Sequence, residues 1–170
     1  MNGRVLVACA TKKGSTREVA EAISETLRAE ALEADCRPAA EVADLRGYSA
    51  IVLGGALYTG RWHADARDFL ERHRGQLATI PLAVFAMGPR TLAESDVEES
   101  RRQLDRALAK VPELDPVSIA IFGGVVDPAK LRFPFSRMPA SDARDWDAIR
   151  AWARGLAAEL APEGVAPTRA

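Results

Sequence analysis

The sequence predicts an α/β domain in which a doubly wound parallel sheet of five strands lies between two layers of helices. Short, nearly continuous apolar runs alternate along the chain with longer segments whose apolar residues recur every three or four positions. Apolar runs of this kind are typical of strands buried on both faces, as in a parallel sheet. Regular alternation of strand and helix favours right-handed crossovers. We therefore expect an open sheet with the strand order 2-1-3-4-5.

Five segments are expected to form the strands. Each is short, mostly apolar and flanked by Gly, Pro or Asp, and the second is the weakest. They are Val5–Ala10, Ala34–Pro38, Ala50–Ala56, Leu82–Met87 and Val117–Phe122. In such sheets, ligands bind outside the carboxyl ends of the strands where the strand order reverses, here between the first and third strands. The turns that follow the strands are therefore the candidate site.

Amphipathic spacing predicts helices between the strands. One helix, the fourth along the chain, is expected from about Glu94 to Val111. The short segment Glu41–Tyr48 is compatible with a helical turn or a loop. In the other helices the apolar stripe is formed by Val19, Ile23 and Leu27, by Ala66, Phe69 and Leu70, and by Trp146, Ile149, Ala153, Leu156 and Leu160.

Length and composition limit the organisation of the chain. With 170 residues, one domain is expected over residues 1–161, and the small residues and two prolines of 162–170 predict a disordered tail. A formal net charge of -1 leaves no overall basic field for nucleic acid. No apolar run approaches the roughly 18 residues of a membrane span, and the N-terminus leads directly into a strand pattern. We expect a cytoplasmic protein.

The two cysteines and two histidines predict no metal site, because they lack the close spacing of metal ligands. Cys9 lies in the first expected strand and Cys36 in the second. Two cysteines fit a reducing compartment, and we expect both to be buried small residues rather than a disulfide.

The turn after the first strand has the composition of a phosphate-binding loop. Residues 11–18 read Thr-Lys-Lys-Gly-Ser-Thr-Arg-Glu, between an apolar strand and an amphipathic helix. Backbone N–H groups converge at such a junction, and the helix N-terminus adds a partial positive charge. Hydroxyls could bind phosphate oxygens, the glycine would let the backbone approach, and the lysines, although expected to face solvent, would raise the local potential. The candidate phosphate-binding residues are Thr11, Lys12, Lys13, Gly14, Ser15 and Thr16.

This turn is neither of the two commonest phosphate motifs. Its spacing is not G-x-G-x-x-G, which marks dinucleotide binding, and it is not G-x-x-x-x-G-K-[ST], which marks nucleoside triphosphate binding. What remains is T-x-x-G-x-T. A plain capping box, with Ser15 as N-cap and Glu18 three residues later, is an equally good interpretation of the turn alone.

The turns after the third, fourth and fifth strands combine glycines with apolar or aromatic residues. Small residues would admit a planar ligand, and an aromatic ring would offer a stacking face. Trp62 could instead pack on the next helix, and His63 is interpreted as a helix-start residue rather than a catalyst. No catalytic side chain is assigned. The candidate ring-binding residues are Ala56, Leu57, Tyr58, Gly60, Trp62, Met87, Gly88, Gly123 and Gly124.

These segments resemble a known family. The T-x-x-G-x-T turn is similar to the FMN phosphate loop of flavodoxin-like proteins, and the G-x-x-x-x-G-x-x-H pattern from Gly55 to His63 is similar to the menaquinone-dependent protoporphyrinogen oxidase type. Residues 5–7, 122–124 and 144–152 fit the same type, so the resemblance extends to about residue 160. It implies a flavodoxin-like fold, FMN as the cofactor, and a quinone or a porphyrinogen as the redox partner.

The chain departs from that type after the fifth strand. There the oxidase type carries a long insert with an apolar or basic helix, which is associated with membrane quinone chemistry. Here the segment 127–143 is short, and Pro134 and Pro139 would interrupt a long helix. It still mixes apolar and basic residues, so it could contact a membrane surface or an apolar substrate, or pack its aromatic residues on the sheet edge. The residues concerned are Lys130, Leu131, Arg132, Phe133, Phe135, Arg137 and Met138.

Three functions follow from this pattern. The first is an FMN-dependent oxidoreductase in which the cofactor does the redox chemistry and the protein sets its potential and access. The second is an FMN electron carrier that binds redox proteins, and the third is a cofactor-free structural or regulatory domain. The acidic residues 94–99 are followed at once by Arg101 and Arg102, which argues mildly against the acidic face of a carrier.

Overall fold

The computed structural model of the chain describes residues 3–11, 14–130 and 133–161. Its central sheet has five parallel strands in the order β2-β1-β3-β5-β6. The strands are β1 (Arg4–Ala10), β2 (Glu33–Pro38), β3 (Tyr48–Tyr58), β5 (Leu82–Met87) and β6 (Ser118–Phe122). This is the expected order 2-1-3-4-5, so the doubly wound topology predicted from the sequence is confirmed. The expected tail, 162–170, lies outside the described residues.

Among the described residues, five helices cover the sheet, and they include all four expected amphipathic helices. They are α1 (Ser15–Ala29), α2 (Ala64–Arg72), α3 (Arg74–Leu77), α4 (Glu94–Leu108) and α5 (Trp146–Leu160). Helix α4 ends three residues before the expected Val111. The segment from Glu41 to Tyr48 is mostly loop and turn, and one 3-10 turn, Ala39–Glu41, precedes it. Two further 3-10 turns, Pro128–Lys130 and Phe135–Arg137, lie in the segment after β6.

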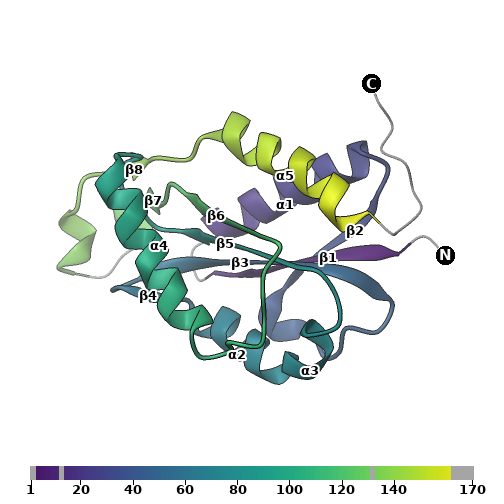
Figure 1. Cartoon of the computed structure of the whole chain (residues 1–170). Coiled ribbons are helices and arrows are strands. Elements are labelled where there is room, and N and C mark those ends of the chain that lie inside the picture. The colour runs from purple at the N-terminus through teal and green to yellow at the C-terminus, as the bar shows by residue number, and fades with distance from the viewer. Residues whose placement is uncertain (1–2, 12–13, 131–132, 162–170) are drawn as a thin grey trace.

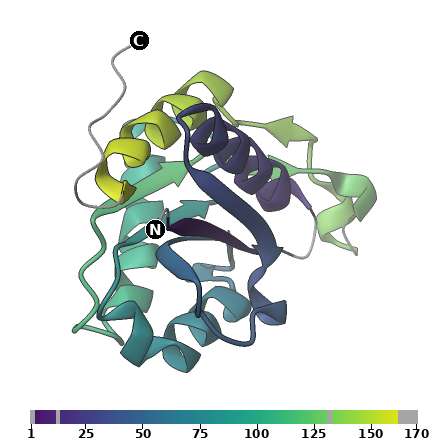
Figure 2. The ribbon, with the colours of Figure 1, turned by 90° about the vertical axis from the view of Figure 1, so that its right-hand side faces the viewer.

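The sheet has a separate apolar layer on each face. Alternate residues of a strand point to opposite faces, so Leu6 and Ala8 pack with α2 and α4, whereas Val5 and Val7 pack with α1 and α5. Figures 1 and 2 show α1 and α5 above the sheet and α2 and α3 below it. Burial on both faces explains why the strands read as continuous apolar runs.

Two short antiparallel strand pairs lie at the carboxyl edge of the parallel sheet, one joined to it and the other forming a separate two-stranded sheet. Strand β4 (Arg61–Trp62) folds back on β3, and β7 (Val125–Val126) pairs with β8 (Ser141–Asp142). Thr59 and Gly60 have φ angles of 47° and 81°, and two positive φ angles in a two-residue hairpin loop define the type I′ turn. Both pairs lie on the side where the candidate turns meet. The sequence patterns did not predict either pair.

No helix within the described residues is long and apolar enough to cross a membrane. The same residues contain no group of three or more His, Cys, Asp or Glu side chains that could hold a metal ion.

Candidate functional site

The turn between β1 and α1 is built around Gly14. This residue is the N-cap of α1 and has φ 87°, in the left-handed region that glycine adopts without strain. Its N–H donates to Thr11 Oγ1 at 3.1 Å, and a Cβ at Gly14 would meet no atom within 4 Å. The capping box expected as the alternative is wrong, because Ser15 is already helical and α1 has no side-chain cap. Lys12 and Lys13 lie outside the described residues.

Thr16 carries the most informative polar atom of this turn. Its side chain is fully buried, and its Oγ1 has no hydrogen-bond partner among the residues that the structure describes. Two other hydroxyls of α1 are satisfied: Ser24 and Thr26 donate to the carbonyls of Ala20 and Ala22 at 2.9 and 2.8 Å. An orphaned buried hydroxyl costs about 1–3 kcal/mol. At a helix N-terminus, where backbone N–H groups are also unpaired, an anion would satisfy it.

The β3–β4 hairpin forms the next wall of the carboxyl edge. Tyr58 keeps 36% of its surface exposed, and burial of the rest raises the pKa of its phenol. His63 is the N-cap of α2, and its Nδ1 accepts the Asp65 N–H at 3.0 Å, which confirms the helix-start interpretation. Trp62 is 1% exposed, and its Nε1 donates to the Gly55 carbonyl at 3.0 Å. Of the two aromatic residues, Tyr58 therefore has the accessible ring and Trp62 packs inside.

The glycines after β5 and β6 bring their turns close together. A Cβ at Gly88 would lie 2.8 Å from the Leu57 side chain, and one at Gly123 would overlap the Ala143 carbonyl. The Gly88 N–H donates to Phe122 O at 3.2 Å, and the Gly124 N–H donates to Pro89 O at 2.9 Å. These turns therefore pack on one another through their glycines. Ala56 and Met87 are buried at the strand ends beneath them.

A cavity of about 230 Å³ opens between the N-terminus of α1, the end of β3 and the segment after β6. Two predicted residues, Ser15 and Tyr58, line it. The structure adds residues that the sequence reasoning did not assign to the cofactor. The complete lining is Ser15, Glu18, Tyr58, Val125, Asp127, Lys130 and Arg144. The remaining predicted ring residues lie outside this lining, so their contact with a ring stays a prediction.

Arg144 is the principal cation of this cavity. Its guanidinium lies 2.9 Å from the Glu18 carboxylate and 2.8 Å from that of Asp142, and it stacks 4.8 Å above the Trp146 ring. The side chain is only 10% exposed. Hydrogen bonds from this guanidinium hold the pKa of Asp142 below its usual range. No sequence signal identifies Arg144, since Asp-x-Arg also occurs at Asp44–Arg46, far from the cavity.

The segment after β6, which contributes Lys130 to this cavity, also presents an apolar side chain to solvent. Phe133 is 71% exposed, and the guanidinium of Arg137 lies 5.2 Å from its ring centre. The interpretation that the aromatic residues pack back on the sheet edge is therefore wrong for Phe133. The expected interruption of a long helix is confirmed, because the helical structure in the described part of this segment is limited to two 3-10 turns. Leu131 and Arg132 lie outside the described residues.

Comparison with known proteins identifies the family of this chain. The model of the family described as "Flavodoxin domain" matches residues 6–138, which is most of the chain. The chain belongs to the flavodoxin domain family. The match includes the β1–α1 turn, the β3–β4 hairpin and the start of the segment after β6, so the candidate site lies largely within the family domain.

A curated relative is the protoporphyrinogen IX dehydrogenase [quinone] of Escherichia coli K12, which is 23% identical over 86 residues. The alignment covers 49% of this chain and 48% of the relative, so the chain spans about half the length of the curated relatives it matches. The resemblance to the protoporphyrinogen oxidase type is thus confirmed as a distant relationship.

Solved flavodoxins share the fold along nearly their whole length. A mutant form of the flavodoxin from Pseudomonas aeruginosa matches with a TM-score of 0.58 and 19% identity, over 92% of this chain and 98% of that one. A short-chain flavodoxin associated with a PDU bacterial microcompartment matches with a TM-score of 0.60 and 16% identity, over 94% and 99%. At these identities the likeness establishes the flavodoxin-like fold alone.

Proposed function

We propose that this protein binds FMN at the carboxyl edge of its sheet and acts as an FMN-dependent oxidoreductase. The observation that carries the proposal is the buried hydroxyl of Thr16 at the N-terminus of α1, unpartnered within the described residues and beside the open face of Gly14. Membership of the flavodoxin domain family supports FMN rather than another phosphate ligand. FMN would supply the redox chemistry when bound.

The chain's own residues would fix the phosphate first. Thr16 Oγ1 and Ser15 can donate to phosphate oxygens, and the first N–H groups of α1 have no carbonyl partners within the helix. Thr11 would hold the turn in shape by accepting the Gly14 N–H, and Lys12 and Lys13 would add positive potential. The isoalloxazine ring would then extend towards Tyr58, whose partly exposed ring offers an aromatic contact. The turns at Leu57, Gly60, Gly88 and Gly123–Gly124 would border it.

The proposed electron acceptor is an apolar small molecule, with a quinone or a porphyrinogen as the candidates. The name of the Escherichia coli relative motivates this choice. The exposed Phe133 with its neighbouring Arg137 supplies an apolar surface flanked by positive charge at the same edge of the sheet. The same surface could make peripheral contact with a membrane, where quinones reside.

An electron carrier is the second candidate. The fold of the Pseudomonas aeruginosa flavodoxin matches this chain over 98% of the flavodoxin's length, which motivates this candidate. A carrier would pass electrons to a redox protein and would react slowly with free quinones.

Two measurements separate these functions. Heat denaturation of the purified protein should release FMN, identified by chromatography against FAD and riboflavin, and a colourless protein that binds no added flavin would indicate a cofactor-free domain. The reduced protein should then be reoxidised by a menaquinone analogue in stopped-flow experiments. Phe133→Ser should slow this step several-fold, while FMN remains bound.

The control is Val117→Ser, because Val117 is also exposed, at 46%, but precedes β6 at the opposite edge of the sheet. It should leave the quinone rate unchanged. Equal rates for all three proteins, together with fast electron transfer to a redox protein, would favour the carrier.

A further inference from the structure

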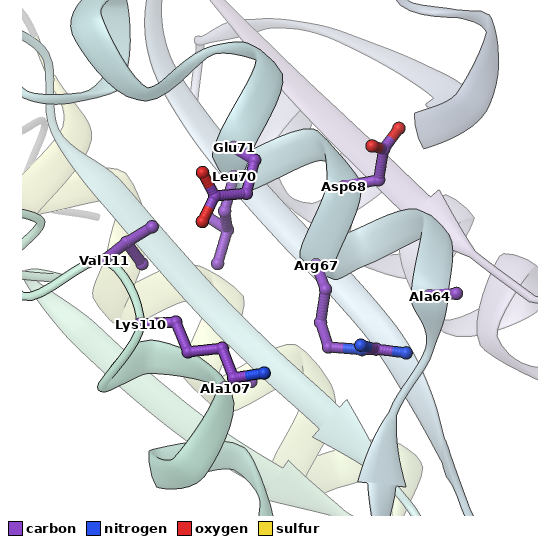
Figure 3. A pocket seen from close by; sticks show the side chains of 8 residues that line it. All are labelled: Ala64, Arg67, Asp68, Leu70, Glu71, Ala107, Lys110 and Val111. Atoms are coloured by element: carbon purple, nitrogen blue, oxygen red, sulfur yellow. The ribbon is translucent and has the colours of Figure 1, made fainter.

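A second hollow lies between α2 and α4, apart from the cavity at the carboxyl edge. One part, of about 320 Å³, is shown in Figure 3 and is lined by Ala64, Arg67, Asp68, Leu70, Glu71, Ala107, Lys110 and Val111. A neighbouring part, of about 230 Å³, is lined by Gly60, Arg61, Trp62, Arg67, Gln103, Arg106, Ala107 and Lys110. Arg67, Ala107 and Lys110 line both parts, so the two form one groove, which we call the α2–α4 groove.

The groove gathers cationic side chains that form no ion pair with a carboxylate of the described residues. Its four cations are Arg61, Arg67, Arg106 and Lys110, and within the described part of the chain none has a carboxylate oxygen within 4 Å. The two carboxylates of the groove already have partners, because Asp68 pairs with Arg72 at 2.9 Å and Glu71 with Arg74 at 3.4 Å. Figure 3 shows Arg67 and Lys110 reaching into the gap between the helices, while the Asp68 carboxylate points away.

Other cationic side chains of α4, away from the groove, do form ion pairs. Arg101 and Arg102 of α4 pair with Asp105 and Glu99 at 3.0 and 2.8 Å. Arg106, one turn later and on the groove wall, makes no such pair with a described residue, because no carboxylate lies three or four positions from it in the sequence. The ionic pairing that neutralises the outer surface of α4 is therefore missing where α4 borders the groove. An anionic ligand would complete it.

The shape of the groove favours a polypeptide over a compact anion. Gln103 to Lys110 covers about two helical turns, on the order of 10 Å along the groove. The cations are distributed along this length, whereas a phosphate needs donors that converge on one point. The floor is apolar, with Leu70, Ala107 and Val111 all buried. Alternating acidic and apolar side chains of an extended segment would match both the walls and the floor.

We propose that the α2–α4 groove binds an acidic segment of a partner protein. The groove ends at the β3–β4 hairpin, where Gly60 and Arg61 line it, and Tyr58 of the same hairpin faces the cavity at the carboxyl edge. A partner held in the groove would therefore lie beside the proposed cofactor site. The groove is formed by residues of the protein alone, so the proposed binding of the acidic segment does not require FMN.

The test uses fluorescence anisotropy with a fluorescein-labelled decapeptide in which Asp and Glu alternate with Leu. The full-length protein should bind it at about 0.02 M salt and lose affinity at about 0.3 M, because exposed charges are screened. The double variant Arg106→Glu/Lys110→Glu should weaken binding by about tenfold or more. The control, Arg150→Glu/Arg154→Glu, makes the same change in net charge on exposed positions of α5 and should retain affinity.

Each other outcome overturns the proposal. Equal losses in the two double variants would mean that only net charge matters. Failure of the wild-type protein to bind the peptide at low salt would exclude an acidic segment as the occupant. If tripolyphosphate displaces the peptide at concentrations at which it saturates the wild-type protein but not the groove variant, the groove is a site for small polyanions instead. Circular dichroism of both variants verifies that they are folded.

Discussion

The Arg144 guanidinium lies 2.9 Å from the Glu18 carboxylate and so joins the chain after β8 to the first turn of α1. The two residues are 126 positions apart. Arg144 also makes a paired contact with Asp142 and stacks on Trp146. One side chain of the cavity lining therefore connects the first turn of α1 to the segment that follows β6.

The first prediction concerns the energy of this link. Arg144→Met should lower the free energy of unfolding by about 1–2 kcal/mol, because it removes two ion pairs of a side chain that is only 10% exposed. Urea denaturation measures this. Arg46→Met is a matched control, since Arg46 makes the same contacts with Asp44 but is 85% exposed. It should lower the free energy of unfolding much less, because this ion pair is exposed to solvent. Equal losses in the two variants would contradict the linking role.

The pH dependence of the same pair has a defined sign. The Arg144 guanidinium lowers the pKa of Asp142 from its ordinary 3.8, so the pair stabilises the fold above that value. This stability is lost as the pH falls through the lower, folded-state pKa. The difference in the free energy of unfolding between wild type and Arg144→Met should therefore be largest near neutral pH and decrease in acid. A difference that grows on acidification would be incompatible with the pair.

The second prediction concerns the hairpin that carries Tyr58. Gly60 has φ 81°, so Gly60→Ala should destabilise the fold by about 1–2 kcal/mol although the added Cβ would meet no atom within 4 Å. Gly155→Ala is the control, because Gly155 also has open space but lies inside α5 and should gain about 1 kcal/mol. Thermal unfolding measures whether each substitution lowers or raises the stability of the fold. A stabilising Gly60→Ala would show that the turn is not of type I′.

The third prediction concerns the two cysteines, which are free thiols on neighbouring strands. Cys9 is buried, whereas Cys36 is only partly buried, so the expectation of two buried residues is confirmed for Cys9 alone. A hydrogen bond with Cys9 lowers the pKa of the Cys36 thiol to about 7, and the same contact raises that of Cys9.

Alkylation of Cys36 by iodoacetamide should therefore show a midpoint near pH 7. Cys9→Ala removes the donor and should move the midpoint towards the ordinary 9.0, whereas Cys9→Ser keeps a donor and should preserve most of the shift. Mass spectrometry identifies the modified residue. An unchanged midpoint in Cys9→Ala would exclude the hydrogen bond as the cause.

Local sequence patterns predicted the fold well because the apolar pattern of each strand and helix reflects which of its faces is buried. Burial on both faces makes β1 and β5 continuously apolar, and the stripe of Ile149, Ala153 and Leu156 identifies α5. The β3–β4 hairpin was missed because Thr59, a β-branched residue, rarely adopts a positive φ and so gives no turn signal. The Arg144–Glu18 contact depends on tertiary folding, and no local pattern reports it.

The glycines illustrate a second limit. Glycine at a strand end indicates close approach of another group, but the sequence does not say whether that group is a ligand or protein. At Gly54 the approaching group is the Phe85 ring, and at Gly88 it is Leu57. At Gly14 the space is open. The phosphate turn is therefore the part of the predicted site that the geometry supports most strongly.

The fourth prediction separates stability from binding at Thr16. Thr16→Val replaces a buried hydroxyl, unpartnered within the described residues, with a methyl group, so it should stabilise the flavin-free protein by about 1 kcal/mol or more. The same change should weaken FMN binding by about 1–3 kcal/mol, alone or with Ser15→Ala, because a charge-assisted hydrogen bond is lost. Thr26→Val, on the same helix but bonded to Ala22 O, should leave FMN affinity unchanged.

The most direct test is a titration of the flavin-free protein with FMN and with riboflavin, which lacks the phosphate. Protein fluorescence or calorimetry provides the affinities. If α1 and Thr16 bind the phosphate, wild type should prefer FMN by at least about tenfold, and Thr16→Val should lose most of this preference without weakening riboflavin binding. Equal affinity of the wild-type protein for the two flavins, or an undiminished preference in Thr16→Val, would contradict the proposed site.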